Sequence, residues 1–443
     1  MAIFIIVVFI IGYVLIALEH PIKIDKAASA LLTGVICWLV LLFGLESMPA
    51  FAHIAGEFSD KHDFIDAELG KHLGEISEIL FFLLGAMTIV ELVDVHDGFR
   101  IITDRIATSS RVRLLWIIAW ITFFLSAALD NMTTAIIMSA LIRKIIKKQD
   151  NVWLFGGFVI IAANAGGAWS PIGDITTIML WIGGQVTSLN IIHSTFLASC
   201  ASLLAPLFVV SYTLRKDKTK RSLHAEDEMK SHKIFTPFEQ KAMFFLGAAG
   251  LLAVPIFKTS THLPPYMGVL LSVGVLWYIT EIMHKGKKEE VRHEFSVAAM
   301  LHRIDTPSIL FFLGILLAVG ALDVSGHLQL LAHFLDNNFG NIYVINGLIG
   351  ILSAIVDNVP LVAACMGMYD LTQVPPDNDF WELLAYCAGT GGSMLIIGSA
   401  AGVASMGILK IDFIWYMKRI SVYAFIGYLA GMLVYYLQHH FHL

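Results

Sequence analysis

The sequence predicts an all-α membrane protein that crosses the bilayer many times and consists of two related halves. Three observations predict this architecture. The 443-residue chain is 57% hydrophobic and only 14% charged, whereas soluble domains carry about 25% charged residues. Many apolar stretches reach about 20 residues, the length that a helix needs to cross a bilayer. Short motifs of the first half also recur in the second half. We therefore expect a polytopic membrane protein and not a soluble domain.

Ten apolar segments are expected to cross the membrane in full. The first begins next to Met1 and lacks the basic leader and small-residue cleavage site of a signal peptide, so we expect it to be retained as a helix. The segments lie at residues 2–18, 27–45, 76–93, 152–181, 191–213, 240–257, 265–283, 305–322, 380–409 and 412–437.

Two further apolar segments, 114–142 and 341–369, are interpreted as re-entrant helical hairpins, which enter and leave the membrane on the same face. Each has about 29 residues, and one straight helix of that length would run about 43 Å, longer than the roughly 30 Å hydrocarbon core. Lys and Arg concentrate on the cytoplasmic side of membrane proteins. The first segment has basic residues at both ends, namely Arg100, Arg105, Arg111, Arg113, Arg143, Lys144, Lys147 and Lys148.

The basic residues also predict the orientation of the whole chain. Segment 341–369 has no Lys or Arg near either end, as expected for a hairpin that enters from the opposite face. With both hairpins in place, 26 of the 29 basic residues fall on the cytoplasmic side, and both termini lie outside. The exceptions are Lys61, Lys71 and Lys258. All basic residues are thus expected at interfaces or in loops, and none inside the membrane.

The second half of the sequence repeats motifs of the first half in the same order. ILFFLLG at 79–85 returns as ILFFLG at 309–314, an Asp-Asn pair follows in each half, and NAGGAWSPIGD at 164–174 is echoed by GTGGSMLIIGS at 389–399. Because the first copy starts outside and the second starts inside, we expect inverted topology, with five crossings and one hairpin in each half. Inverted repeats with broken helices near the midplane are the architecture of secondary transporters.

This repeat divides the chain into three parts, which are a first repeat at 1–213, a basic cytoplasmic linker at 214–239 and a second repeat at 240–443. Within the repeats, the glycine-rich segments 152–181 and 380–409 are expected to be broken helices. Backbone that is not helical is tolerated at the membrane midplane only where it is buried in protein or lines a wet cavity. We therefore expect the glycine-rich breaks and the two hairpin tips to form the functional site.

Each hairpin tip carries an Asp-Asn pair inside an apolar run. Asp130 and Asn131 stand in ALDNMTTAIIM, and Asp357 and Asn358 stand in AIVDNVPLVAA. Asx side chains cap helix starts, so capping alone could explain both pairs. A neutral Asn or Ser would cap as well, however, whereas an ionised Asp in the membrane costs several kcal/mol unless it is paired. Two such residues at matching positions favour a bound cation, and a capping carboxylate keeps lone pairs free for an ion.

The tips and the glycine-rich loop resemble the hairpin tips and unwound helices of the ion transporter superfamily. Within it, ALDNMTT, AGGAWSPIGDITT and VDNVP resemble the NhaD-type sodium/proton antiporters, and the resemblance covers nearly the whole chain. Dicarboxylate carriers of the superfamily have Ser-Asn-Thr at both tips. Here Asp replaces the Ser in both tips, and Val359-Pro360 replaces the expected Thr in the second. These departures argue against carboxylate substrates, because two extra negative charges would repel them.

The resemblance and the residue chemistry imply the same cation site, because carboxylate, amide and hydroxyl oxygens are hard ligands that suit Na⁺ or Li⁺. The expected ligands are Asp130, Asn131, Thr134, Ser170, Asp174 and Thr176 in the first half and Asp357, Asn358, Ser393 and Ser399 in the second. Ser399 stands where the first half has Asp174, so only the first half carries two carboxylates and the stronger sodium site is expected there. Small-residue helix packing is an alternative explanation for the three serines.

Proton exchange is expected at the same carboxylates. Burial raises the pKa of a carboxyl group and a bound cation lowers it, so Na⁺ and H⁺ can compete for one group without a separate proton pathway. Asp130, Asp174 and Asp357 can all serve in this way. Glu91, in the third crossing, is a further candidate, because acids inside the membrane usually have a function.

The histidines and two amphipathic segments have simpler explanations. His53, His62 and His72 are expected in an acidic external loop at 46–75, as solvated side chains. His96 is expected at the cytoplasmic end of the third crossing, where titration near neutral pH could sense acidity. The tail histidines, His439 among them, suggest no specific role. Interfacial helices are expected at 97–110 and 326–336.

The sequence therefore predicts a secondary transporter, not an enzyme, that exchanges Na⁺ or Li⁺ for H⁺ by alternating access. It is expected to span an inner (plasma) membrane of bacterial type, with the lipid bilayer as its surroundings, no cofactor besides the transported ions and no nucleic-acid partner. No Walker-type glycine loop precedes a Lys-Ser/Thr pair, so ATP is not expected to drive it. The resemblance further implies a homodimer that is active at alkaline pH and contributes to pH homeostasis.

Three alternatives remain open at this point. A Na⁺-coupled carrier of a di- or tricarboxylate or an inorganic anion fits the same fold, with helix N-termini directed at the midplane. A cation channel could line a pore with the hairpins, although an inverted repeat favours alternating access. An intramembrane hydrolase would need a nucleophile with a neighbouring base, and no His lies near the expected breaks.

Overall fold

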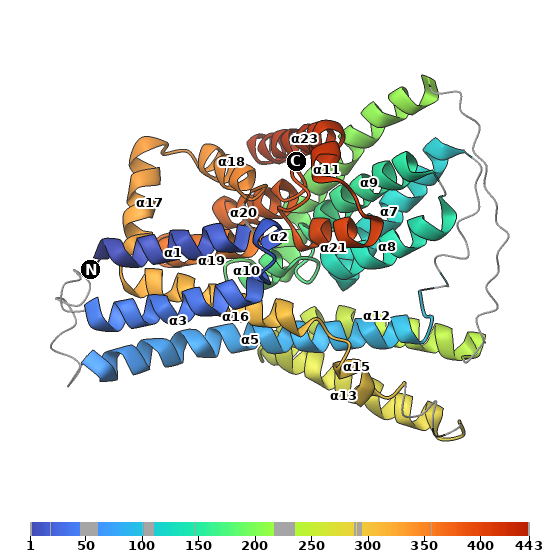
Figure 1. Cartoon of the computed structure of the whole chain (residues 1–443), viewed down its shortest axis with the longest axis horizontal. Coiled ribbons are helices and arrows are strands. Elements are labelled where there is room, and N and C mark those ends of the chain that lie inside the picture. Colours follow the sequence, from blue (N-terminus) through green and yellow to red (C-terminus); the bar gives the residue numbers. More distant parts are fainter. Residues whose placement is uncertain are drawn as a thin grey trace.

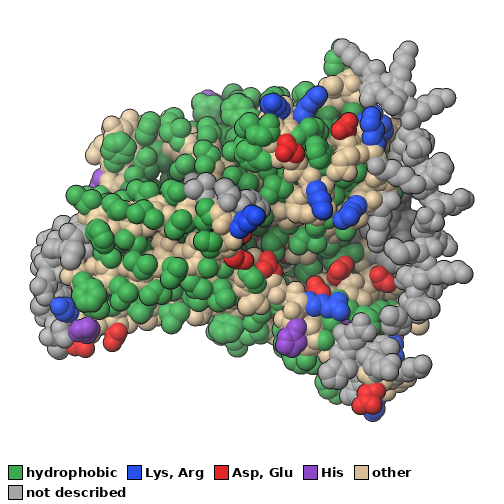
Figure 2. Space-filling view, in the orientation of Figure 1, with side chains coloured by type: hydrophobic (Ala, Val, Ile, Leu, Met, Phe, Trp, Pro, Cys, Tyr) green, Lys and Arg blue, Asp and Glu red, His purple; other side chains and the backbone are tan. Residues whose placement is uncertain are grey.

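The computed structural model describes residues 2–17, 19–44, 61–99, 101, 110–146, 148–216, 235–287, 289, 295–355 and 357–441. Within these ranges the regular elements are all helices, as the sequence predicts. Eight of the described helices are long and apolar enough to cross a membrane, or nine if one bent pair counts as a single span. Hydrophobic side chains cover most of the face seen in Figure 2, with acidic and basic side chains gathered towards its middle and its two ends. The protein is therefore a multi-pass membrane protein.

Six helices form what we call the long-helix bundle, which fills the lower part of Figure 1. Within it, α3 packs against α1 and α16, while α5 packs against α12, α13 and α16. The six are α1 (Ala2–Ala17), α3 (Lys26–Gly44), α5 (Lys61–Val95), α12 (Pro237–Thr261), α13 (Pro265–His284) and α16 (Thr306–Val324). Two short helices, α2 (Glu19–Ile22) and α15 (Val297–Leu301), flank them.

A second group of helices, several of them short or interrupted, forms the broken-helix bundle, in which α7 packs against α8 and α9, and α20 packs against α11, α18 and α23. Its members are α7 (Arg111–Leu129), α8 (Asn131–Ile145), α9 (Gln149–Gly167), α10 (Ile175–Ile182), α11 (Ser188–Lys216), α18 (Ile342–Leu352), α19 (Asn358–Met368), α20 (Asp379–Gly391), α21 (Ala400–Leu409), α22 (Phe413–Arg419) and α23 (Ser421–His440). These helices occupy the upper part of Figure 1.

The two bundles meet along a few elements. Helix α10 contacts α5, α7 contacts α12, and α19 contacts α16. Helix α17 (His327–Asn338) packs on both α16 and α19 and so bridges the two groups. The helices of the broken-helix bundle that lie against the long-helix bundle are therefore the ones that begin or end at the predicted breaks.

Close backbone contacts at the breaks recur in both halves of the chain. A Cβ atom added to Gly166 in α9 would lie 2.2 Å from the carbonyl oxygen of Phe123 in α7. A Cβ atom added to Gly391 in α20 would lie 2.0 Å from the carbonyl oxygen of Gly350 in α18. Both glycines are needed because no side chain fits there. The expected breaks are present, since each of these helices ends within one residue of its glycine and resumes as α10 or α21.

The predicted hairpins correspond to helix pairs that are interrupted at the Asp-Asn pairs. In segment 114–142, α7 ends at Leu129 and α8 begins at Asn131, and the two pack against each other. In segment 341–369, α18 ends at Leu352 and α19 begins at Asn358. Helix α7 is by itself long and apolar enough to cross a membrane. Re-entry on one face and inverted topology therefore stay predictions.

Several predicted boundaries were wrong. Residues 61–75, predicted as part of an external loop, are the first turns of the 35-residue helix α5. The predicted crossing 412–437 is divided at Ile420 into α22 and α23, and α22 lies at 117° to α21. The predicted first crossing is the 16-residue helix α1, which is shorter than the eight candidate spans. Most of segment 97–110 and of the linker lies outside the described residues.

Candidate cation-binding site

Four helices of the broken-helix bundle begin at predicted site residues. Helices α8, α10, α19 and α21 have Asp130, Asp174, Asp357 and Ser399 as their N-caps. Each side chain accepts a hydrogen bond from a backbone N–H group, of Thr133 at 2.7 Å, Thr176 at 3.0 Å, Val359 at 3.3 Å and Gly402 at 3.2 Å respectively. The capping interpretation is thus confirmed. Three of the four caps are carboxylates, which places negative charge where four helix N-termini open.

Asp174 lies where the two tips meet, and it is 1% exposed. The side-chain amide of Asn131, from the first tip, donates to its Oδ2 atom at 2.6 Å. The amide of Asn358, from the second tip, donates to its Oδ1 atom at 3.4 Å. The Thr176 hydroxyl donates to Oδ1 at 3.0 Å. Asp174 is therefore a buried carboxylate that accepts hydrogen bonds from a neutral donor of each tip.

Asn164 connects the two halves of this site, and sequence reasoning missed it. Its Oδ1 atom accepts from the Asn131 amide at 3.2 Å, while its own amide donates to the hydroxyls of Ser393 and Ser399, each at 2.9 Å. Asn164 is fully buried in α9. The available signal was an amide in a largely apolar helix, two residues before the paired glycines of the break. The two serines lie in the network and are not mere packing residues.

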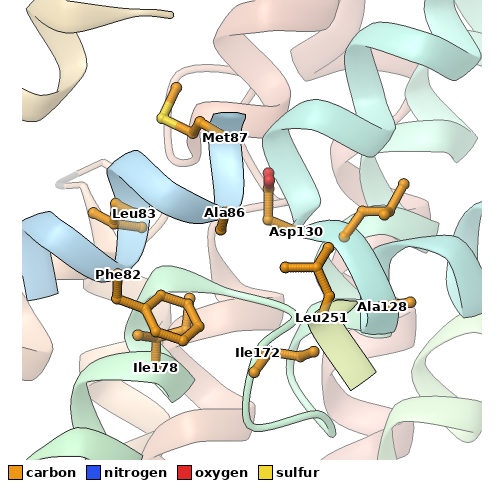
Figure 3. A pocket seen from close by; sticks show the side chains of 10 residues that line it. Phe82, Leu83, Ala86, Met87, Ala128, Asp130, Ile172, Ile178 and Leu251 are labelled. Atoms are coloured by element: carbon orange, nitrogen blue, oxygen red, sulfur yellow. The ribbon is translucent and has the colours of Figure 1, made fainter. Parts of the chain in front are cut away.

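Asp130 faces the long-helix bundle, as Figure 3 shows. Its Oδ2 atom accepts from the Thr133 hydroxyl at 2.7 Å. Its backbone has a φ of 138°, in the region that favours glycine, so this tip is held in a strained conformation. The side chain borders a cavity of about 20 Å³, enough for one water-sized species. The other lining residues are apolar, namely Phe82, Leu83, Ala86, Met87, Ala128, Leu129, Ile172, Ile178 and Leu251.

Asp357 also faces the long-helix bundle, but it meets a cation there. The ammonium group of Lys26, the first residue of α3, lies 3.6 Å from Asp357 Oδ2. The same ammonium lies 4.4 Å from the centroid of the Phe311 ring in α16. Lys26, which the sequence places at a membrane interface, thus contacts the second tip.

The remaining hydroxyl ligands predicted in the first half differ in their surroundings. The Ser170 hydroxyl donates to the carbonyl oxygen of Ala127 at 2.6 Å, which fastens the break after α9 to the end of α7. The Thr134 side chain is fully buried, and its hydroxyl has no hydrogen-bond partner among the residues that the structure describes. Burying a hydroxyl without a partner lowers the stability of the fold. The Thr134 oxygen therefore remains available to a ligand beside the first tip.

Glu91 lies apart from the site. Its carboxylate is 4.0 Å from the guanidinium of Arg303, and its side chain is 27% exposed. It follows Met87, which lines the Asp130 cavity, by one turn of α5. Glu91 therefore lies one helical turn beyond the lining of the Asp130 cavity, paired with Arg303, and its proton-carrying role stays a prediction.

Of the two loop histidines that the structure describes, His62 is exposed as expected and His72 is not. His72 lies in α5, where its ring packs edge-on to Trp38 at 6.1 Å. His96 is fully buried, and its Nε2 atom lies 3.1 Å from Nε2 of His284. His53 lies outside the described residues.

His439, for which no role was expected, lies beside two acids at the end of α23. Its Nε2 atom is 3.3 Å from Glu382 Oε2 and 3.7 Å from Asp379 Oδ1. The Tyr435 hydroxyl also donates to Glu382, at 2.7 Å. Within the described ranges, Asp379, Glu382 and His439 are the one group of acids, histidines or cysteines close enough to share a metal ion. The three site aspartates do not form such a group.

A larger cavity of about 820 Å³ lies between the bundles. On one side it is lined by α5 and α16, through residues such as Ile79, Leu316 and Gly320. On the other side it is lined by the C-terminal ends of α10 and α19, through residues such as Met179 and Met366. The helices that begin at Asp174 and Asp357 thus end at a solvent-accessible space between the two bundles.

Comparisons with known proteins place these features among ion carriers. Residues 13–384 match a family described as citrate transporter. The chain is 47% identical over 435 residues to sodium/proton antiporter 1 of Arabidopsis thaliana, covering 98% of this chain and 72% of that protein. It is 44% identical to sodium/proton antiporter 2 of the same plant, covering 97% and 98%. It is 30% identical to the Na⁺/H⁺ antiporter NhaD of Alkalimonas amylolytica, covering 97% and 89%.

Proposed function

Because the chain belongs to the citrate transporter family and to the NhaD-type sodium/proton antiporters, it is a secondary transporter, and we propose that it exchanges Na⁺ or Li⁺ for H⁺ across a plasma membrane. In this proposal Asp174 binds either the cation or the proton, but not both, so each ion drives the other across. The two tips supply further ligands. The exchange proceeds by alternating access.

The observation that carries the proposal is the burial of Asp174 between two amides. A carboxylate that is 1% exposed is unstable when it is ionised and has only neutral donors around it. Its contacts at Asn131, Asn358 and Thr176 are all neutral. Such a group is stabilised by one positive charge, which either H⁺ or Na⁺ can supply. This arrangement suits exchange of the two ions at one position.

The groups around Asp174 also offer the ligands that a sodium ion needs. Hard cations prefer oxygen ligands from carboxylates, amides and hydroxyls. Each amide of the two tips has an oxygen that can replace its nitrogen when the group turns over, and the Thr134 hydroxyl is buried without a partner among the described residues. Asp130 and Asp357 add negative charge from the neighbouring helix starts. Together these amides, this hydroxyl and these carboxylates would attract a cation. Their hard oxygen atoms favour Na⁺ or Li⁺, which are small, hard ions.

Alternating access is supported by the division into two bundles. The site lies in the broken-helix bundle, while α5, α12 and α16 of the long-helix bundle face its tips. We propose that the broken-helix bundle moves against the long-helix bundle, and that the cavity of about 820 Å³ is one of the two access routes. The predicted inverted repeat would account for the second route, because each half would adopt the other's arrangement in turn.

A second candidate function is the Na⁺-coupled transport of a di- or tricarboxylate. The family description, which names citrate, favours it. The three carboxylate caps oppose it, because an anion would approach helix N-termini that are already neutralised by Asp130, Asp174 and Asp357. We therefore propose cation exchange as the function and treat anion uptake as its rival.

Proteoliposomes with an imposed pH gradient test the proposal. Adding Na⁺ or Li⁺ should dissipate the gradient with the wild type and fail to do so with Asp174→Asn. The matched control is Asp412→Asn, because Asp412 caps α22 in the same way, at 2.8 Å from the Trp415 amide, outside the site. Asn caps as well as Asp, so only loss of ion exchange separates the two variants. Uptake of labelled citrate with Na⁺, without proton movement, would establish the rival function instead.

A further inference from the structure

The two tips have the same Asp-Asn sequence but different electrostatic surroundings. Asp357 has the Lys26 ammonium 3.6 Å from its Oδ2 atom, and the two side chains are only 15% and 20% exposed. Asp130 borders a cavity whose other lining residues are apolar, and within the described ranges it makes no ion pair. The second tip therefore has a cation of the protein's own, whereas among the described residues the first tip has none.

Lys26 reaches the second tip from the other bundle. It is the first residue of α3, in the long-helix bundle, while Asp357 caps α19, in the broken-helix bundle. Its ammonium is also held over the Phe311 ring of α16, 4.4 Å from the centroid. A cation over an aromatic face is attracted to it. The ammonium thus contacts one side chain of its own bundle, Phe311, and one of the other bundle, Asp357.

We propose that Lys26 is a tethered competitor of the transported cation: its ammonium occupies Asp357 when no Na⁺ is bound near the second tip, and Na⁺ must displace it. This inference rests on the proposed exchange function and adds a specificity-determining residue to it. An ammonium group and Na⁺ carry the same charge, so Asp357 is paired in either state. Its charge is never left alone in a partly buried position, which would be costly.

Two consequences follow from this competition. The lysine cannot diffuse away, so it competes at a high effective concentration and weakens the apparent affinity for Na⁺. Because the pair joins the two bundles, its replacement by Na⁺ also removes a contact between them. Na⁺ binding would thereby loosen the broken-helix bundle for movement, and the return without Na⁺ would be completed by Lys26 pairing with Asp357 again.

The test compares three variants by Na⁺ binding and by transport kinetics. Lys26→Met keeps the length of the side chain and removes its charge, Lys26→Arg keeps the charge, and Lys23→Met is the matched control because Lys23 is exposed on the turn before α3. Na⁺ binding is measured as the Na⁺-dependent rise in melting temperature of purified protein. Exchange is measured in proteoliposomes, with KM for Na⁺ and the maximal rate determined separately.

Lys26→Met should lower the half-saturating Na⁺ concentration about fivefold, the scale of one partly exposed ion pair, and should also lower the maximal rate. Lys26→Arg and Lys23→Met should stay within about twofold of the wild type in KM. If Lys26→Met does not fold, Lys26→Gln is expected to show the same decrease. A merely structural lysine would lower the rate without improving Na⁺ binding.

Wild-type exchange combined with an unchanged or higher KM in Lys26→Met and Lys26→Gln would overturn this inference and leave the proposed function intact. A wild type that neither binds nor exchanges Na⁺ would overturn the proposed function, and this inference with it. A KM decrease that persists in an Asp357→Asn background would also overturn the inference, because the competition requires that carboxylate.

Discussion

Thr134 illustrates how a single residue can serve ion binding at the expense of stability. It lies in the first turn of α8, is fully buried, and has a hydroxyl without a hydrogen-bond partner among the described residues. Natural active sites often carry such locally unfavourable groups. Ser170, another predicted ligand of the first half, by contrast donates its hydroxyl to the carbonyl oxygen of Ala127. The difference suggests that Thr134 is retained for a ligand and not for the fold.

Thr134→Val should therefore raise the melting temperature and weaken Na⁺ binding together. Valine has the same shape, and removing a buried hydroxyl without a partner stabilises the fold by about 1 kcal/mol. Loss of one ligand should raise KM for Na⁺ about tenfold, or about 1.4 kcal/mol. The measurements are thermal unfolding in detergent and Na⁺-dependent exchange in proteoliposomes.

Thr122→Val is the matched control for this change. Thr122 is equally buried, but its hydroxyl donates to the Ile118 carbonyl oxygen at 2.7 Å. Its replacement should not stabilise the protein and should leave KM unchanged. If Thr134→Val lowers the melting temperature or leaves KM at the wild-type value, Thr134 is a structural residue.

At the scale of elements, the breaks depend on close contact between backbones. Gly166→Ala should destabilise the protein by roughly 1–3 kcal/mol, because overpacking forces neighbouring groups to shift. The contacting atom is the Phe123 carbonyl oxygen, which belongs to the backbone of α7 and cannot turn aside. Gly274→Ala, in α13, is the control, since a Cβ atom there would have no neighbour within 4 Å. Equal melting temperatures for the two variants would show that the break tolerates a side chain.

The breaks could be predicted from sequence because glycine and Asp-Asn pairs mark helix ends through local chemistry. The surroundings of the tips could not be predicted in the same way. Lys26 was assigned to an interface because it precedes an apolar segment, and only the packing of α3 on α16 brings it to Asp357. His72 was assigned to a loop because residues 46–75 are polar. It lies in α5, where its ring packs against Trp38, a contact between distant parts of the chain that the local sequence does not reveal.

His96, the residue that follows α5, and His284, the last residue of α13, form a buried pair. Protonation of this pair should make the stability of the protein depend on pH. The His96 Nδ1 atom donates to the Leu92 carbonyl oxygen at 2.6 Å, so its Nε2 atom must accept from His284. Burial lowers the pKa of His96, which lies just beyond the apolar span of α5, to about 4. Lys287 and Glu239 form an ion pair near His96. The Phe235 ring contacts both His96 and the Lys287 ammonium.

Stability should therefore fall as the pH decreases from about 6.5 to about 4. In the unfolded chain His96 has an ordinary pKa of about 6.5 and binds a proton in this range, while the folded protein does not. The stabilisation is complete above pH of about 6.5. His96→Gln, which can still accept from His284, should lose much of this decline in melting temperature, whereas the exposed His62→Gln should decline like the wild type. A decline of wild-type size in His96→Gln would contradict the assignment.

For the whole molecule, the proposed motion is a displacement of one bundle against the other. Gly367 of α19 and Asp323 of α16 meet across the bundle interface, where a Cβ atom on Gly367 would lie 3.2 Å from Asp323 Cγ. In a protein without its four native cysteines, a disulfide between cysteines at these two positions should stop exchange. Reduction should restore it, because the bond would hold the bundles in a single arrangement.

A disulfide inside one bundle should have no such effect if the bundle moves as a unit. Gly85 of α5 and Val269 of α13 both belong to the long-helix bundle, and a Cβ atom on Gly85 would lie 3.5 Å from Val269 Cβ, within the range of a disulfide. Exchange should continue when these two positions are joined. Alternating access by relative motion requires both results, since a channel or a local rearrangement at the tips would tolerate the first cross-link as well as the second.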